Sequence, residues 1–272
     1  MKIAVYLGKN GAETENRLTE LLASLERGGC ECYFTDAGSG LAPDTEMVLS
    51  VGGDGTFLSV SKLVADSGIP VVGVNMGRLG FLSENRPEDV AEALLRGDYT
   101  IEDRALLCAA PIDADGNFEE EVFALNEVTV HRCGPAVLGV DVCLGGKWLP
   151  TYWADGLIVS TSSGSTAYSL SVGGPIVLPQ SKVLIISPIA PHNLNIRPLV
   201  VPDTSVISLK MHSRDGRFVL TADNRTIEVA ESVQIEITVA QFSLKRVRLN
   251  HSNFITALTE KLFWGEDVRN IR

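Results

Sequence analysis

The sequence has no run of about 18 consecutive apolar residues, the minimum for a transmembrane helix, so no membrane-spanning helix is expected. Its start, MKIAVYLGKNG, has too short an apolar run for a signal peptide and predicts a first strand instead. Basic residues are in the minority, with 23 Lys and Arg against 34 Asp and Glu and a formal net charge of −11. This balance argues against binding to nucleic acid or to a membrane surface, although a local cluster of amides and cations could still hold an anion.

Cysteine is also scarce. The sequence has five cysteines and no CxxC pair, so a structural zinc site is not expected. Reduced, mostly buried thiols and a cytoplasmic protein are the plainer interpretation. The cysteines are Cys30, Cys32, Cys108, Cys133 and Cys143.

Strands alternate with helices in the N-terminal part of the chain. This alternation predicts an α/β domain over residues 1–100, with a Rossmann-like parallel sheet and helices on both faces. Apolar runs predict strands at 2–7, 30–35, 47–51 and 69–75, and helical patterns cover 13–27, 57–65 and 87–97.

The pattern changes near residue 101. Short alternating runs separated by turn signals predict a mainly-β domain over residues 101–249. A C-terminal helical tail is expected over 250–272, and its helix is expected to pack back on the body. Its apolar residues at helical spacing are Phe254, Leu258, Leu262 and Phe263.

The stretch GGDGT at 52–56 follows an apolar strand and has no lysine behind its glycines, so it is not a Walker phosphate loop. Ligands of α/β sheets bind at the carboxyl ends of strands, where glycines and a helix N-terminus favour a phosphate. An isolated carboxylate there would repel phosphate, so Asp54 suits a general base or a magnesium contact. The alternative is a tight turn in which Asp54 caps the following helix.

Further motifs favour an enzyme. In combination they resemble the NAD kinases, which phosphorylate the 2′-hydroxyl of the adenosine ribose of NAD to make NADP, although diacylglycerol kinases, sphingosine kinases and phosphofructokinases share GGDGT. The resemblance covers nearly the whole chain, roughly residues 1–265. It rests on GGDGT (52–56), NMGRLGFLSE (75–84), ALNEVTV (124–130), DGLIVSTSSGSTAYSLSVGGPIV (155–177), PIAPHNLNIRPLVVP (188–202) and Asp223.

Two departures from the family pattern are present. Where the family has TPTGSTAY, this chain has TSSGSTAY at 161–168, and the lost proline is expected to loosen the loop. Where the family has Asp-Gly, this chain has Asp223-Asn224, and we expect Asn224 to tolerate a left-handed backbone nearly as well as glycine. Both changes bear on substrate preference more than on catalysis.

The resemblance implies a role for each motif residue. Asp54 is the implied general base, and the Asn126–Glu127 pair binds hydroxyls and amides of the dinucleotide. Asp155 reaches its nicotinamide end, and Asp223 is a further site residue. Around the phosphates lie Gly52, Gly53, Gly55, Thr56 and Phe57, and on the adenine side lie Ser163, Thr166, Ala167, Tyr168 and Ser171.

Assignments outside the motifs stay open. Arg197 could neutralise a phosphate or pair with a carboxylate, and His192 is interpreted as structural. The family assembles into dimers and tetramers, so a homodimer or homotetramer is expected here. Across such an interface Arg132, Lys147 and Lys182 are candidate phosphate partners.

The function implied is that of an NAD kinase with ATP, or polyphosphate, as donor and Mg²⁺ or another divalent cation as cofactor; no metal ligand is assigned. A dinucleotide-binding sensor with weak catalysis is an alternative, for which the Ser162-Ser163 departure is the only support. A lipid kinase built on the same GGDGT domain would lack the Asn-Glu pair and the GSTAY segment. It would also show an apolar or basic membrane-facing surface, which this acidic chain does not predict.

Overall fold

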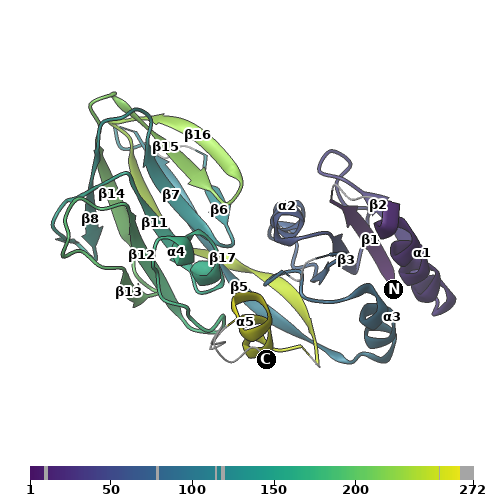
Figure 1. Ribbon diagram of the computed structural model, residues 1–272. Helices are drawn as coiled ribbons and strands as arrows, with labels where there is room; N and C mark the ends of the chain where they lie inside the picture. The colour runs from purple at the N-terminus through teal and green to yellow at the C-terminus, as the bar shows by residue number, and fades with distance from the viewer. Residues whose placement is uncertain (9–11, 78–79, 114, 118–119, 251, 264–272) are drawn as a thin grey trace, which may run out of the picture. The chain divides into compact units, whose positions relative to one another are not determined.

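Figure 1 shows a computed structural model, which describes residues 1–8, 12–77, 80–113, 115–117, 120–250 and 252–263. The chain forms two compact units: unit 1 contains Met1–Asp103 and the chain from Leu244 onward, and unit 2 contains Arg104–Ser243. The chain enters unit 2 within β5 (Tyr99–Ile112) and leaves it within β17 (Gln234–Leu249). Arg78 and Leu79 of the predicted NMGRLGFLSE loop, and 264–272 of the predicted tail, lie outside the described residues.

Unit 1 is built on a parallel sheet in the order β2–β1–β3–β4, as the sequence predicts, with the C-terminal end of β17 beside β4. Every residue of β3 is buried, because helices cover both faces of the sheet: α1 and α3 lie on one face and α2 on the other (Figure 1). The elements are β1 (Lys2–Leu7), α1 (Ala12–Arg27), β2 (Glu31–Thr35), β3 (Met47–Val51), α2 (Asp54–Val64), β4 (Val71–Val74), α3 (Pro87–Arg96) and α5 (Phe254–Leu262).

Residues 244–249 belong to unit 1, although the sequence analysis placed them in the second domain. The reason is strand pairing, since Arg246 on β17 pairs with Val71 on β4. The local sequence of a strand does not reveal which neighbour it pairs with.

The predicted C-terminal helix is confirmed and packs on unit 1. Ala257 and Leu258 are buried, and the Phe254 ring lies 6.0 Å from the Phe81 ring. Phe263 was expected on the apolar face of this helix, but it follows the last helical residue with a φ of 51° and is 65% exposed. The pattern of apolar residues therefore predicted a helix that ends one residue later than α5 does.

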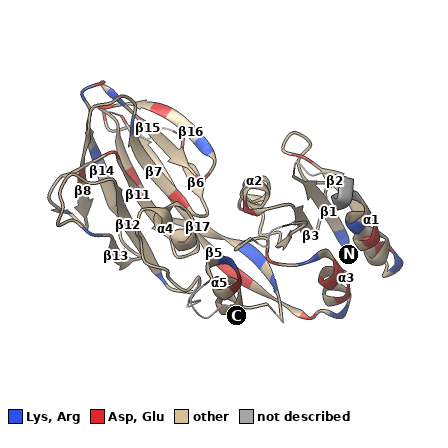
Figure 2. Ribbon diagram, in the orientation of Figure 1, with Lys and Arg blue, Asp and Glu red and all other residues tan. Residues whose placement is uncertain are grey.

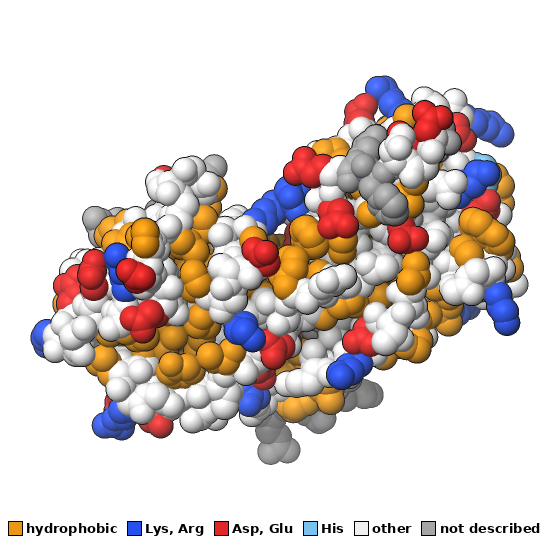
Figure 3. Space-filling view, turned by 180° about the vertical axis from the view of Figure 1, so that it is seen from behind, with side chains coloured by type: hydrophobic (Ala, Val, Ile, Leu, Met, Phe, Trp, Pro, Cys, Tyr) orange, Lys and Arg blue, Asp and Glu red, His pale blue; other side chains and the backbone are white. Residues whose placement is uncertain are grey.

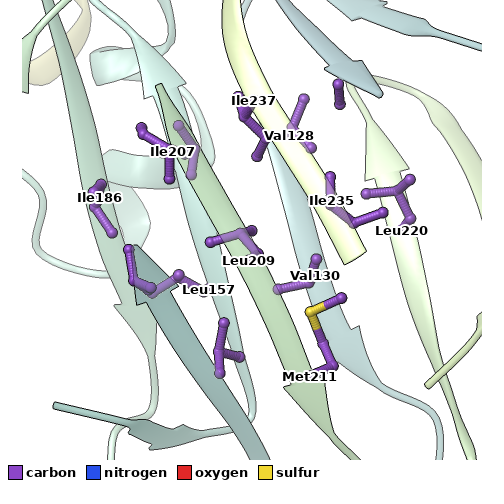
Figure 4. Close-up of a cluster of buried hydrophobic side chains, with 14 of the residues drawn as sticks. Val128, Val130, Leu157, Ile186, Ile207, Leu209, Met211, Leu220, Ile235 and Ile237 are labelled. Carbon is purple, nitrogen blue, oxygen red and sulfur yellow. The ribbon is translucent and has the colours of Figure 1, made fainter. Parts of the chain in front are cut away.

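Unit 2 is a β-sandwich, which confirms the predicted mainly-β domain. One sheet has the order β13–β12–β11–β7–β15–β16, and the other has β10–β8–β14 followed by β17 and then β5 and β6, with β9 on β8. Apolar side chains of both sheets interdigitate, as Figure 4 shows for Val128, Leu157 and Leu220 against Leu209 and Ile235. The remaining elements are β6 (Val122–Ala124), β7 (Glu127–Arg132), β8 (Leu138–Leu144), β9 (Lys147–Trp148), β10 (Tyr152–Ala154), β11 (Gly156–Thr161), η1 (Ser163–Thr166), α4 (Tyr168–Ser171), β12 (Val183–Ile189), β13 (Leu199–Pro202), β14 (Ile207–His212), β15 (Arg217–Ala222) and β16 (Arg225–Ala230).

Charged side chains are dispersed in both units. Blue and red residues are intermixed along the elements in Figure 2, and the face drawn in Figure 3 shows no broad area of basic side chains. None of the helices among the described residues has the length and apolar character needed to cross a membrane.

Candidate active site

The GGDGT segment forms the turn from β3 into α2. Gly52 has a φ of 152°, and a Cβ there would lie 2.3 Å from the Thr56 hydroxyl oxygen, so only glycine fits. Gly53 is the N-cap of α2, which begins at Asp54 rather than at residue 57 as expected. A Cβ on Gly53 or Gly55 would meet nothing within 4 Å, so the backbone here is open to a ligand.

Asp54 does not cap its own helix. The N-cap of α2 is Gly53, and the hydrogen bonds of the Asp54 carboxylate go to another segment, so Asp54 is not simply a cap of the following helix. Instead, its carboxylate accepts three consecutive backbone N–H groups from a segment distant in sequence. These come from Phe81 at 2.8 Å, Leu82 at 3.0 Å and Ser83 at 2.9 Å.

Two glycines allow this arrangement. A Cβ on Gly80 would lie 1.9 Å from a carboxylate oxygen of Asp54, and a Cβ on Gly73 of β4 would lie 2.5 Å from the Leu82 carbonyl oxygen. Asn85 ties the same segment to β4 by donating to the Gly73 carbonyl at 2.9 Å. The segment that holds Asp54 is therefore fixed against the sheet of unit 1.

A buried arginine holds the other side of that segment. Arg246 on β17 is 3% exposed and lies 2.7 Å from the Glu84 carboxylate, which is 6% exposed. Arg246 also donates to the Phe81 and Leu82 carbonyls at 3.4 and 3.5 Å and lies 3.5 Å from the Glu102 carboxylate. The sequence analysis missed Arg246, which lies in no motif, and it assigned no role to Glu84, although Glu84 ends the NMGRLGFLSE motif.

In unit 2, Asp223 makes the same kind of contact as Asp54. Its carboxylate accepts the backbone N–H groups of Leu125 at 2.8 Å, Asn126 at 2.9 Å and Glu127 at 3.3 Å. Asp223 itself has the left-handed backbone of this turn, with a φ of 50°, whereas Asn224 does not have a positive φ. The tolerance of Asn224 for that conformation is therefore not called upon, and the family's glycine position is not strained here.

Glu127 begins β7 with a carboxyl group that is largely buried. Burial raises its pKa to about 7, and the nearby Asp223 carboxylate contributes in the same direction, while the Tyr168 backbone N–H opposes the shift. One of its oxygens, Oε2, is buried without a hydrogen-bond partner among the described residues. The alternative in which Glu127 points into solvent at a strand end is wrong.

The GSTAY segment packs directly on the Asn-Glu pair. A Cβ on Gly164 would lie 2.1 Å from the Asn126 carbonyl oxygen, so glycine is required for this close approach. Thr161 donates its hydroxyl to the Leu125 carbonyl at 2.7 Å and its N–H to the Asn126 carbonyl at 2.9 Å. Near this contact lie Ser163, which is buried, Thr166 and Ala167, which are half-buried, and Tyr168, which is 40% exposed.

The Ser162 departure does not leave the loop loose. Ser162 is buried, and its hydroxyl donates to the Pro179 carbonyl at 2.8 Å. Its φ of −58° is one that proline also adopts. A hydrogen bond to the chain beyond α4 therefore holds the loop at the position where the family has a proline.

Asp155 lies at the other end of the β7–β11 pair from Glu127. It precedes β11, in which Ser160 pairs with Glu127, so it is roughly 15 Å away along the strand. Its carboxylate accepts a hydrogen bond from Arg132 Nε at 2.6 Å. Arg132, a candidate phosphate partner, is thus already engaged within its own chain.

The remaining predicted residues lie outside these clusters. The side chain of Phe57 is fully buried, so its predicted place beside the phosphates stays a prediction for its backbone alone. Ser171, Lys147 and Lys182 are exposed. Arg197 donates to the carbonyls of Leu194 and Ile196, both at 2.8 Å, instead of pairing with a carboxylate, and the His192 N–H donates to the Trp153 carbonyl at 2.8 Å.

Comparison with known proteins matches each of the two units to a domain of the same family. The family model of the ATP-NAD kinase N-terminal domain matches residues 33–98, and that of the ATP-NAD kinase C-terminal domain matches residues 125–249. The chain belongs to the NAD kinase family. It is 44% identical to an NAD kinase of Flavobacterium psychrophilum over 83% of this chain and 78% of the relative.

Solved structures of NAD kinases share the fold. A yeast NADH kinase in complex with NADH has a TM-score of 0.87 at 23% identity and covers all of this chain and 90% of its own. An NAD kinase from Archaeoglobus fulgidus in complex with ATP has a TM-score of 0.76 at 25% identity, over 92% of this chain and 94% of its own. The chain is an enzyme of this family, a kinase that acts on NAD.

Proposed function

We propose that Asp54 is the general base that takes the proton of the ribose 2′-hydroxyl of NAD as the γ-phosphate of ATP is transferred to it. Phosphoryl transfer needs positioning and charge neutralisation more than covalent chemistry. The observation that carries this role is the set of three amide contacts that fix the carboxylate beside the open turn. A carboxylate has about four acceptor positions, so at least one remains for the incoming hydroxyl.

The phosphates of ATP are assigned to the backbone around Gly53 and Gly55. Support comes from the absence of neighbours around both glycines and from their place at the N-terminus of the 11-residue α2. The related Archaeoglobus fulgidus enzyme binds ATP, and we assign ATP rather than polyphosphate as the donor for this reason.

Magnesium fits this site only as an ion carried by the phosphates. No group of three or more His, Cys, Asp or Glu that could hold a metal exists among the described residues, and Asp54 already accepts three amides. Mg²⁺ commonly binds through substrate phosphates with at most one or two carboxylates. When bound, it neutralises charge on the transferred phosphoryl group, and we assign no residue of the chain as its ligand.

NAD is assigned to unit 2. The free Oε2 of Glu127 suits a ribose hydroxyl, and the exposed Tyr168 ring suits the adenine base. Asp155 would serve the nicotinamide end, because its distance from Glu127 along the strand is of the length of a dinucleotide. The related yeast enzyme binds NADH, so either redox form is a candidate substrate.

We further propose a homo-oligomer in the cytoplasm. Trp148 and Trp153 are 58% and 42% exposed, and aromatic side chains are enriched at subunit interfaces. β10, which carries Trp153, is an edge strand. All five cysteines are free, and three of them are buried, which suits a reducing compartment.

The test is turnover by the purified chain with NAD, ATP and magnesium, with NADP read through an NADP-specific dehydrogenase. We expect NADP to form, and to form with ATP faster than with polyphosphate. Parallel reactions with NADH define the redox preference. Binding of NAD without any turnover on either donor would contradict the proposal and would instead indicate a dinucleotide sensor.

A further inference from the structure

Lys261 has an unusual environment within unit 1. It lies on α5 with its Nζ 3.8 Å from the centroid of the Phe81 ring, a cation–π contact with the residue whose N–H binds Asp54. Its Nζ is buried and has no hydrogen-bond partner among the described residues. An ammonium group has three donors, and leaving them unpaired in a buried position is costly. Such an environment is typical of a group whose partner is a ligand.

The charges around Lys261 come from three other places in unit 1. Asp54 on α2 and Glu84 attract its ammonium, Glu260 on α5 does so more weakly, and Arg246 on β17 repels it. Burial nevertheless lowers the pKa of Lys261 to about 8, because desolvation outweighs these attractions. At neutral pH the side chain is therefore mostly cationic.

Lys261 is also relevant to the GGDGT turn, which has no positive charge of its own. GGDGT lacks the lysine that a Walker loop places behind its glycines, and its only charge is the carboxylate of Asp54, which repels phosphate. A cation must therefore come from elsewhere, and Lys261, from the far end of the chain, lies over the ring of Phe81, whose N–H binds Asp54. Arg246 does not supply it, because its guanidinium is occupied by Glu84, Glu102 and two carbonyls.

We propose that Lys261 is a further binding residue of the kinase reaction: its ammonium pairs with the phosphate chain of the nucleoside triphosphate beside Asp54 and supplies the positive charge that the GGDGT turn lacks. The contact lets an anionic phosphate approach the carboxylate that acts as base. This inference rests on the proposed role of Asp54. It extends that role by placing the α5 helix in the donor site.

Two variants of Lys261 test the proposal by steady-state kinetics of the full chain. Lys261→Met keeps length and apolar contact but removes the charge, so KM for ATP should rise about 10- to 100-fold, the loss expected for one charge-assisted hydrogen bond. KM for NAD should stay within about twofold. Lys261→Arg should recover part of the ATP affinity. Lys245→Met removes an exposed lysine of the same unit and should leave both KM values unchanged.

Three further measurements separate binding from a structural role. The melting temperature of Lys261→Met should equal or exceed that of the wild type, since the variant removes a buried, unpaired ammonium. The KM of the wild type for ATP should rise as pH increases through about 8, where the ammonium deprotonates, and that rise should be absent in Lys261→Met. Titration of inorganic triphosphate into both proteins by calorimetry gives the same comparison without turnover, with weaker binding expected for the variant.

An unchanged KM for ATP in Lys261→Met would overturn the inference. So would a lower melting temperature together with an equal rise in the KM values for ATP and NAD. Asp54→Asn, assayed beside it, keeps the two proposals distinct. If Asp54→Asn is inactive while Lys261→Met behaves as wild type, only the role of Lys261 is wrong. If Asp54→Asn turns over normally, the proposed base itself is wrong.

Discussion

Asp54 in unit 1 and Asp223 in unit 2 make matching contacts with different neighbours. Each carboxylate accepts three consecutive backbone N–H groups from a segment distant in sequence. Beside Asp54 lies the cation Lys261, whereas beside Asp223 lies a second carboxylate, Glu127. The first environment suits an anionic phosphate and the second suits neutral hydroxyls, and on the proposed assignment the same backbone motif serves the two substrates of the kinase in different ways.

The largest expected effect is the difference in kcat between the variants Asp54→Asn and Asp223→Asn. Each change leaves one backbone N–H facing an amide group, and each should lower the melting temperature by a few degrees. Asp54→Asn should also reduce kcat by about 10²–10⁴-fold, because it removes the general base. Asp223→Asn should mainly raise KM for NAD. Equal effects of the two variants on kcat would remove the distinction between the two aspartates.

Replacing the buried Arg246, which holds the segment that binds Asp54, should lower the free energy of unfolding far more than replacing a neighbouring exposed lysine. Arg246→Met leaves the buried Glu84 without its cation and should cost about 3–5 kcal/mol of unfolding free energy. Arg246→Lys should not restore this, because one ammonium cannot reach two carboxylates and two carbonyls. The neighbouring Lys245→Met breaks an exposed pair with Asp103 and should cost at most about 1 kcal/mol. Denaturant unfolding measures all three, and a small loss in Arg246→Met would contradict the network.

Glu127 should make the stability of unit 2 depend on pH. Its pKa is raised in the folded state to about 7 from 4.5. Between these two pH values the folded protein therefore binds more protons than the unfolded chain, and it loses stability as the pH rises through this range. Glu127→Gln lacks this loss, so its melting temperature should match the wild type near pH 5 and exceed it by a few degrees at pH 8. The same variant should bind NAD about tenfold more weakly. A melting advantage that did not change with pH would contradict the assignment.

The smallest effect is expected at Ser162. Ser162→Ala loses the hydrogen bond to Pro179 and should cost about 1 kcal/mol. Ser162→Pro loses the same bond but suits the observed φ of −58° and stiffens the unfolded chain, so it should lie closer to the wild type. Chemical denaturation distinguishes the two, and a Ser162→Pro variant less stable than Ser162→Ala would show that the backbone does not accept proline.

Local patterns predicted much of the fold. The apolar runs at 2–7 and 47–51 became β1 and β3 with the same bounds, because a strand buried on both faces is continuously hydrophobic. The 14-residue β5 was not predicted, since its first half is polar and exposed and only its pairing partners make it a strand. Helix ends were less accurate than helix positions.

The site was predicted only where its residues share a motif. Asp54, Glu127 and Asp223 were proposed as site residues from their sequence context, but their amide contacts depend on segments brought together by the fold. Lys261 lies in an ordinary amphipathic helix, and Arg246 lies in a strand, so neither carries a local signal. Long-range packing, rather than composition or spacing, decides which charges surround a catalytic carboxylate.

The most direct test of the division between the two aspartates is calorimetric titration of NAD into purified Asp54→Asn, with turnover measured on the same preparation. The expected result is an NAD affinity within about threefold of the wild type, with turnover reduced about 10²–10⁴-fold. An NAD affinity that falls in step with turnover would contradict the account, because Asp54 would then bind the dinucleotide instead of acting as the base.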